Sequence, residues 1–348
     1  MTIMQTESIL QLPLSWARIS TANPAFKLVK LPFNATNWIP TAEVPQSYSF
    51  DQLYQSHLSQ LPNGFVLQSC GLPVRDYLIE QGCQVAAMGA EAVLELPWRG
   101  KRSVRELARR GRRHGTVQEI PLNQTHQHKL AQLIDNSPAR QGVQLRHTER
   151  TEFDESTRCF VFETKEKVWM GAITLSTVVA PTYFHTELLL RHKDAQVGVM
   201  EALVTAIARQ LAQEGGERLS LGNVTPLPET ESEAIFAPHR HPQELWTQSQ
   251  LSFQVGRSLN FAYNSEGLWR FKNKFISRWE PLYLCASPRL SWATMAGLLH
   301  AMGYVNLVWS QVRDSLTSAL PTFKPQFPTP SGHCVLGLKF IRSMMTAK

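Results

Sequence analysis

The hydrophobic periodicity of this chain changes several times between residues 158 and 222, and these changes limit the folds it can adopt. Short runs rich in β-branched and aromatic residues predict four strands, at 158–163, 168–176, 183–191 and 218–222. Before the last strand, apolar residues recur at spacings of three and four from 198 to 214, which predicts an amphipathic helix. The order strand, strand, strand, helix, strand indicates an α/β fold with a mixed sheet.

Positive charge is concentrated in residues 99–113. This segment contains eight basic residues and one acid, Glu106, so its net charge of +7 equals that of the whole 348-residue chain. Ser103 and Glu106 have the spacing of a capping box, which predicts that a helix starts here. Its outer face then carries a stripe of cations: Arg105, Arg109, Arg112 and the adjoining Arg113. We predict that the stripe binds a polyanion, either the tRNA backbone or an anionic lipid surface; a solvated face without a partner is the alternative.

Composition indicates a globular protein in a reducing compartment. With 348 residues and 43% apolar residues, the chain has room for about two domains of ordinary size. Its five cysteines include no C-x-x-C pair, so neither a disulfide framework nor a metal site is predicted. The first thirty residues lack the features of a secretory signal. We therefore expect a cytoplasmic location.

Apolar anchors and cations alternate without a break in residues 263–284. The pattern can be written N-x-x-G-L-x-x-F-K-x-K-F-x-x-R-W-E-P-x-Y-L, and its polar positions are Asn264, Lys272, Lys274, Arg278, Glu280 and Tyr283. It resembles the closing signature of the phosphatidylglycerol lysyltransferases. The resemblance implies two acyltransferase units of the GNAT type in tandem, and transfer of an amino acid from charged tRNA to a membrane lipid.

The middle of the chain is similar to the same family. Arg191 and Glu201 lie in a stretch that matches the family pattern R…G-x-M-[DE], and residues 221–227 match L-G-x-x-P-L. The family usually has an acid three residues before the arginine, a place that Leu188 occupies here. Glu187 lies one residue earlier, and on an extended strand it shares a face with Arg191.

The resemblance suggests catalytic roles for several of these residues. Aminoacyl transfer needs cations or hydrogen-bond donors around the developing oxyanion. Candidates for this task are Arg191, Lys272 and Lys274, while Glu187 or Glu201 is expected to bind the donor's amino group or to relay a proton. Substrate contacts are expected from Asn264, Arg278, Glu280 and Tyr283. A structural alternative for Glu201 is interaction with the dipole of its own helix.

The connection between the third strand and the helix bears on the donor. Acetyltransferases of this fold hold the pyrophosphate of coenzyme A on a glycine-rich turn at a helix start. Residues 191–198 offer a single glycine, Gly198, together with the acid Asp194. We therefore favour aminoacyl-tRNA over acyl-CoA as the donor, and expect no bound cofactor.

The resemblance covers about residues 65–285 and weakens toward the N-terminus. We predict a shortened or degenerate GNAT-like unit at 1–125, the acyltransferase unit at 126–288, and an apolar helix with a flexible tail at 289–348. Residues 290–312 carry no formal charge over 23 positions, which is long enough to cross a bilayer. Glycine, histidine and asparagine within the segment favour a helix in the membrane interface or packed on the domain.

The resemblance and these patterns together predict an aminoacyltransferase that is either soluble in the cytoplasm or peripheral on the inner face of the membrane. Its donor is expected to be aminoacyl-tRNA, and its acceptor a phospholipid similar to phosphatidylglycerol or another amphiphile. Two alternatives stay open: a non-catalytic module that binds nucleic acid or anionic membrane, and an acyl-CoA-dependent N-acyltransferase. The sequence carries no signal for an oligomeric state.

Overall fold

The computed structural model describes residues 10–20, 22–138, 145–147, 157–177, 182–245, 265–306 and 308–310. The chain divides into two units, Met1–Gln311 and Val312–Lys348, and every described residue lies in the first. The division expected at residue 125 stays a prediction, and the expected flexible tail lies outside the described residues.

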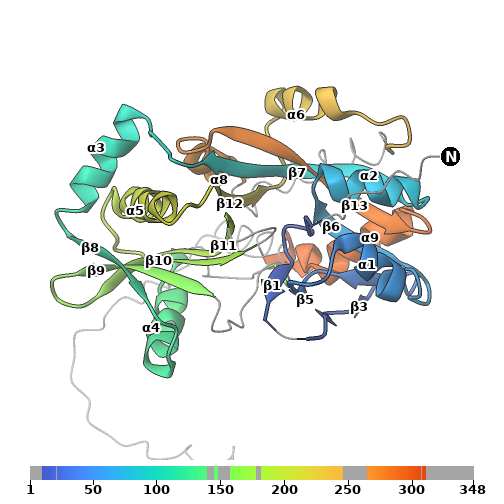
Figure 1. Ribbon diagram of the computed structural model, residues 1–348, viewed down its shortest axis with the longest axis horizontal. Coiled ribbons are helices and arrows are strands. Elements are labelled where there is room, and N and C mark those ends of the chain that lie inside the picture. The colour runs from blue at the N-terminus through green and yellow to red at the C-terminus, as the bar shows by residue number, and fades with distance from the viewer. Residues whose placement is uncertain are drawn as a thin grey trace, which may run out of the picture. The chain divides into compact units, whose positions relative to one another are not determined.

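A ten-stranded mixed sheet runs through the first unit (Figure 1). Its strands in spatial order are β3 (Val29–Lys30), β4 (Asn37–Ile39), β6 (Phe65–Cys70), β13 (Arg278–Ser287), β7 (Gln84–Glu95), β12 (Arg218–Val224), β11 (Tyr183–Arg191), β10 (Trp169–Thr177), β9 (Arg158–Thr164) and β8 (Gly115–Ile120). A second, three-stranded sheet has the order β1 (Ala17–Ile19), β5 (Ala42–Pro45), β2 (Ala25–Phe26). The α/β class expected from the sequence is confirmed.

Helices connect these strands and cover the large sheet. In chain order they are α1 (Phe50–Leu53), the π-helical η1 (Tyr54–Leu58), α2 (Leu72–Glu80), α3 (Arg102–Gly111), α4 (Gln124–Asp135), α5 (Val199–Gln213), α6 (Glu229–Phe236), the short 3₁₀ helix η3 (Ala237–His239), α8 (Ser265–Lys272) and α9 (Trp292–Ala301). Helices α3 and α5 pack in one apolar cluster with Phe160 and Phe162 of β9. Helix α4 packs in another cluster with Cys159 and Val161 of the same strand, as the alternation of side chains along a strand requires.

The four strands and the helix expected between residues 158 and 222 are confirmed, with ends that differ by two residues or fewer. Strand β11 has one irregularity: its pairing with β10 shifts register between Thr186 and Leu188, so Glu187 lies in a β-bulge. The bulge reverses the alternation of side chains. Phe184 therefore packs in the cluster of α5, whereas Leu188 packs in the cluster of α4.

Strand β13, near the end of the described chain, pairs with two strands from a much earlier part of the sequence. It pairs antiparallel with β6 on one side, where Tyr283 is opposite Cys70, and with β7 on the other, where Leu284 is opposite Ala86. The strand therefore lies inside the sheet, although it comes last in sequence among the strands of the described residues. The signature that ends at Leu284 is consequently a central structural element.

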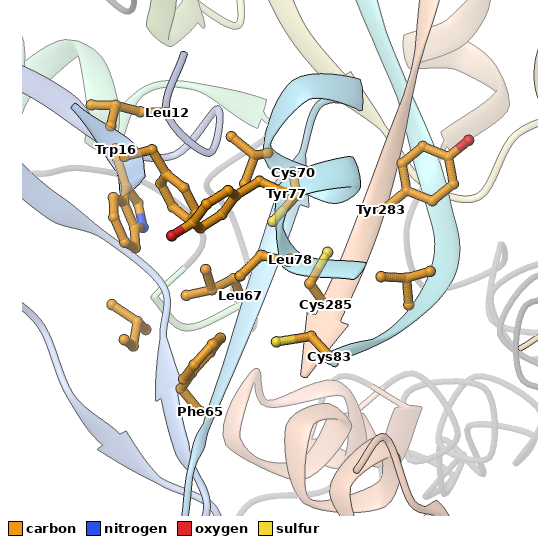
Figure 2. Packing of buried hydrophobic residues seen from close by; sticks show 14 of the residues in the cluster. Leu12, Trp16, Phe65, Leu67, Cys70, Tyr77, Leu78, Cys83, Tyr283 and Cys285 are labelled. Carbon is orange, nitrogen blue, oxygen red and sulfur yellow. The ribbon is translucent and has the colours of Figure 1, made fainter. Parts of the chain in front are cut away.

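Side chains from β6, α2 and β13 form a large buried cluster (Figure 2). It includes Phe65, Leu78 and Tyr283, together with the neighbouring thiols of Cys70 and Cys285. Burial raises the pKa of the Cys285 thiol well above its usual value, and the neighbouring Cys70 raises it further. The Cys285 thiol therefore stays protonated and acts as a small apolar side chain.

Helix α3 forms where it was expected, but the predicted capping box is wrong. The helix begins at Arg102, and no side chain caps its N-terminus. Glu106 instead binds Arg109 at 3.0 Å and Arg110 at 3.2 Å, the cations one turn further along. A carboxylate gains more from two guanidinium groups at these spacings than from a backbone N–H near Ser103.

The end of α3 lies directly against the start of α5. A Cβ atom added at Gly111 would lie 2.2 Å from the carbonyl oxygen of Gly198, and one added at Gly198 would lie 2.2 Å from that of Leu107. Gly198 also has a φ of +99°, which other residues rarely adopt. The two glycines thus allow a backbone contact that no side chain would permit.

The expected apolar helix after residue 289 is present as α9. Ser291 caps it by accepting a hydrogen bond from the Thr294 N–H at 3.1 Å, and Leu298 is buried against the large sheet with Leu290. Within the described part of the chain, each helix is too short or too polar to cross a bilayer.

The glycine contact between α3 and α5 gives a stability prediction. Replacing Gly111→Ala places a methyl group on rigid backbone, so we expect a loss of about 1–3 kcal/mol in the free energy of unfolding. Gly71→Ala is the control, because its added Cβ meets only the mobile side-chain amide of Gln11. Denaturant unfolding compares the two variants. Equal losses in both would show that the helices do not depend on this contact.

Candidate active site

Strands β11 and β12 separate in the middle of the sheet. Their parallel pairing stops at His185 opposite Ser220, although both strands continue. The Thr186 hydroxyl donates to the Ser220 carbonyl oxygen at 2.8 Å and so closes the paired part. Beyond this point β12 pairs with β7 alone. Polar side chains gather where the strands part.

A buried lysine occupies this split. Lys272, the last residue of α8, is 5% exposed, and its Nζ donates to the backbone oxygen of Asn223 on β12 at 2.8 Å. Strand β12 makes room for the amine with a bulge, since Leu221 and Gly222 together face one residue of β7. Gly222 has a φ of +81°, and a Cβ there would lie 3.4 Å from Nζ.

A carboxyl group, a phenol and an imidazole share the site with Lys272. Glu91 of β7 is 1% exposed and accepts a hydrogen bond from the Tyr183 hydroxyl at 2.5 Å. Nδ1 of His185 lies 3.2 Å from the Ser220 hydroxyl oxygen, which also accepts from the Gly222 N–H at 3.1 Å. We call Glu91, Tyr183, His185, Ser220 and Lys272 the Lys272 cluster.

Burial shifts the protonation equilibria of this cluster toward neutral forms. It lowers the pKa of Lys272 to about 7, an effect that the nearby charge of Glu91 opposes. It raises the pKa of Glu91 to about 7, although hydrogen bonds from Ser220 and Tyr183 oppose the shift. Burial, with a smaller contribution from Lys272, lowers the pKa of His185 to about 3, so the imidazole is neutral at physiological pH. An amine and a carboxyl that both titrate near neutrality are suited to proton transfer.

Lys274 points to a different place from Lys272. The chain turns after α8, and Nζ of Lys274 forms an ion pair with Glu201 Oε1 at 3.1 Å. Glu201 is buried in the first turn of α5, whereas the side chain of Lys274 is 41% exposed. The pair thus offers a carboxylate and an accessible cation near the start of α5.

Glu187 and Arg191 lie further along β11. Glu187, in the bulge, accepts a hydrogen bond from the Ser176 hydroxyl at 2.5 Å. Arg191 is exposed at the end of the strand, and its guanidinium donates to the Ala195 oxygen at 2.7 Å. Its hydrogen bond therefore holds the loop before α5. Within the described residues, no hydrogen bond or ion pair links Arg191 to Lys272 or Lys274.

The predicted substrate contacts are spread along β13. Arg278 forms ion pairs with Glu95 and, at 2.6 Å, with Glu280. Glu280 is opposite Glu91 in the pairing of β13 with β7, so it lies next to the Lys272 cluster. Tyr283 is fully buried, with the guanidinium of Arg75 4.5 Å from its ring centre. Asn264 lies outside the described residues.

Helix α3 presents the predicted cationic stripe to solvent. The side chains of Arg105, Arg109, Arg112 and Arg113 are all exposed, while Val104 and Ala108 are buried against the domain. Glu106 neutralises part of this charge through its pairs with Arg109 and Arg110. Arg105, Arg112 and Arg113 are the strongest candidates for contact with a polyanion.

Sequence reasoning selected Lys272 but missed the other members of its cluster. Nothing in the sequence linked Glu91 to Tyr183 or Lys272, which lie 92 and 181 positions away. Their meeting depends on the pairing of β7 with β12. No group of three or more histidine, cysteine or acidic residues within the described ranges could hold a metal ion.

Comparison with solved structures identifies the fold. The chain is similar to L-PGS from Bacillus licheniformis, with a TM-score of 0.59 and 16% identity over 81% of this chain and 86% of the other. It is also similar to the C-terminal domain of a protein assigned as a lysylphosphatidylglycerol synthetase from Agrobacterium fabrum, with a TM-score of 0.57 and 18% identity over 81% and 85%. These likenesses confirm the predicted acyltransferase fold. A search of curated protein sequences finds no match.

A family model gives the assignment. Residues 63–286, more than half of the chain, match the model described as "Phosphatidylglycerol lysyltransferase, C-terminal". The fold and this match define an acyltransferase of the aminoacyl-transferring class. The chain belongs to the phosphatidylglycerol lysyltransferase C-terminal family. The matched residues contain the Lys272 cluster, Glu201 and Lys274.

The buried amine predicts a pH-dependent difference in stability. Below about pH 7 Lys272 is charged in both the folded and the unfolded state, and the full cost of burying that charge is present. Between pH 7 and 10.5 the amine is charged only in the unfolded state, so the free-energy cost of burying that charge falls progressively as the pH rises. Compared with Lys272→Met, the wild type should therefore gain stability from pH 7 to 9, by at most about 1.4 kcal/mol per pH unit.

Thermal or denaturant unfolding at several pH values measures this difference. Lys165→Met, at an exposed position in the β9–β10 turn, is the control for loss of one lysine. A constant or falling difference between wild type and Lys272→Met across this range would contradict a buried amine that titrates near neutrality.

Proposed function

We propose that this protein transfers an aminoacyl group from aminoacyl-tRNA to a hydroxyl group of a phosphatidylglycerol-like phospholipid. The observation that carries the proposal is the Lys272 cluster. These buried acidic and basic side chains lie where β11 and β12 separate, within the residues that match the family model. Family membership supports the class of reaction. The donor, the acceptor and the roles of individual residues are our inference.

Lys272 is proposed as the general base. The acceptor hydroxyl attacks the ester carbonyl of the aminoacyl group, and its proton passes to the neutral amine of Lys272. The ester bond to the tRNA then breaks, and the amine returns the proton to the departing ribose oxygen. A base with a pKa near the working pH is best suited to both steps. Glu91 tunes the amine through its charge.

The ion pair of Glu201 and Lys274 is proposed to bind the donor at the start of α5. The exposed amine of Lys274 is suited to bind an anionic group of the donor. The buried carboxylate of Glu201 would bind the α-ammonium group of the donor. Glu187 is a second carboxylate for that ammonium group, and Arg191 supports the loop between the two acids.

The surroundings of α5 favour tRNA over acyl-CoA as the donor. Binding a pyrophosphate at a helix start requires close approach to the first backbone amides. At the start of α5, Gly111 of α3 already lies against Gly198 and the Val199 nitrogen. Helix α3 instead offers exposed arginines to the phosphates of a polynucleotide. This arrangement supports an aminoacyl-tRNA donor and no bound cofactor.

Transfer of a radiolabelled amino acid from charged tRNA into phosphatidylglycerol tests the reaction. Replacing Lys272→Met should lower kcat/KM by about a hundredfold or more, because the base is lost while most of the apolar stem stays in place. The wild-type rate should rise as pH passes through about 7, and the residual rate of the variant should not. Lys274→Met and Arg191→Met are assayed in parallel, and Lys165→Met is the control.

Three results would contradict the proposed chemistry. If a folded Lys272→Met variant transfers at the wild-type rate, Lys272 is not the general base. Absence of wild-type transfer from a panel of charged tRNAs, with transfer from acetyl-CoA instead, would favour the N-acyltransferase. Absence of transfer from either donor would favour a binding module, the alternative that the exposed stripe on α3 supports.

The stripe on α3 gives an independent prediction for donor binding. Replacing Arg105, Arg112 and Arg113 together with glutamine should weaken tRNA binding and reduce the slope of log K against log salt by about two to three, because each phosphate contact releases counterions. Binding is measured by filter retention or anisotropy over a salt series. An unchanged slope would identify the stripe as a solvated face without a nucleic-acid partner.

A further inference from the structure

Large apolar side chains are exposed mainly around α9. Eight such side chains are exposed in the described part of the chain, and five of them come from residues 28–33 and 292–309. The five are Leu28, Phe33, Trp292, Val305 and Trp309. Trp309 is 72% exposed and Phe33 is 60% exposed, so both side chains face mostly water. Because these exposed apolar side chains are concentrated in two segments, we expect them to form an interaction site.

The two segments meet in space. The Asn34 side-chain amide donates to the Thr294 hydroxyl oxygen at 2.7 Å, which fixes the turn between β3 and β4 on α9. The Phe33 and His300 rings lie 6.3 Å apart. A Cβ at Gly297 would lie 3.2 Å from Leu31, so helix and turn are in close contact. We call this combined surface, with the exposed residues that follow α9, the α9 surface.

Apart from the exposed imidazole of His300, helix α9 is apolar on its solvent side, and its buried side is apolar apart from Thr294. Leu298 and Thr294 face the protein, while Trp292, Ala293 and Ala296 face solvent. A surface helix normally presents charged residues to water. Residues 290–312 have no formal charge at all. An outward apolar face of this kind is suited to a partner.

Cations surround the α9 surface. Lys27 and Lys30 flank the apolar turn, Arg289 precedes the helix, and Arg146 lies next to Gly303, with all four side chains exposed. Residues 22–36 and 288–310 contain no aspartate or glutamate. These segments therefore combine exposed apolar side chains with exposed cations and contain no carboxylate.

The positive charge of the α9 surface indicates which kind of partner it binds. Residues 312–348 contain five basic residues and one acid, so the chain's own tail would bring further positive charge to a positive rim. A second copy meeting this surface across a two-fold axis would oppose the same cations. An anionic bilayer provides negative headgroups beside an apolar interior, and tryptophan prefers that interface.

We propose that the α9 surface docks this protein on an anionic phospholipid bilayer. Phe33, Trp292 and Trp309 enter the interface, while Lys27, Lys30, Arg146 and Arg289 bind headgroup phosphates. The proposal extends the proposed function, because it names the surface on which the protein meets its lipid acceptor. Docking itself requires no donor and no transfer.

Sedimentation of the full chain with vesicles tests the apolar part of the surface. The variant Phe33→Ser, Trp292→Ser, Trp309→Ser should partition about tenfold or more weakly onto vesicles that contain phosphatidylglycerol. These side chains are about half or more exposed, so the fold should tolerate their loss. Val168→Ser, an exposed apolar residue in the β9–β10 turn, is the matched control and should bind like the wild type.

A second pair of variants tests the charged rim. Lys27→Gln with Lys30→Gln should weaken binding to phosphatidylglycerol vesicles by about tenfold, and the difference should shrink in high salt. Lys165→Gln with Arg209→Gln removes the same charge from exposed positions elsewhere and should have little effect. Pure phosphatidylcholine vesicles should bind every variant weakly.

Three outcomes would overturn the proposal. The first is a wild-type protein that does not bind anionic vesicles, and the second is an apolar variant that binds as well as the wild type. The third is a wild-type dimer that this variant dissociates, which would make the surface an interface between copies. Transfer to acceptor lipid dissolved in detergent is measured separately. If transfer fails while vesicle binding is intact, the proposed function is refuted and the docking proposal is not.

Discussion

The fold depends on one long-range pairing, the insertion of β13 between β6 and β7. Without β13, the strands of residues 65–95 would expose two unpaired edges inside the domain, and unpaired backbone groups are costly when buried. Phe65 and Val85 come from these strands, and Cys285 comes from β13; all three are in the same buried cluster (Figure 2). Because α8, which ends at Lys272, and the turn that carries Lys274 directly precede β13, the same pairing places both lysines.

Burying Lys272 is unfavourable by itself, and the neighbouring backbone and side chains reduce the cost. The Asn223 oxygen accepts one hydrogen bond from the amine, and Glu91 provides opposite charge. Its position in the split gives the amine space that a regular strand pairing would exclude, and glycine at position 222 allows the left-handed backbone of the bulge, with a φ of +81°. Functional sites often retain such locally unfavourable groups, because a shifted pKa is what their chemistry needs.

Sequence reasoning predicted the local elements well and the assembled site only in part. Strong periodicity predicted β9, β10, β11 and α5, since each of these patterns depends on neighbouring residues. The capping box at Ser103 failed because Arg109 and Arg110 compete for Glu106. Glu91 was not assigned a role, because its partners arrive through strand pairings across the sheet. The divergence of Lys272 and Lys274 depended on where α8 ends, which periodicity did not indicate.

The order of the strands separates the two basic surfaces of this protein. Helix α3 leads into β8 at one edge of the ten-stranded sheet, and the turn of the α9 surface follows β3 at the other edge. The Lys272 cluster lies on β7, β11 and β12, between these edges. A polynucleotide donor bound at α3 and a bilayer bound at α9 would not compete for the same cations. The two proposed partners therefore have separate surfaces on one sheet, and the base that would join their reaction lies between them.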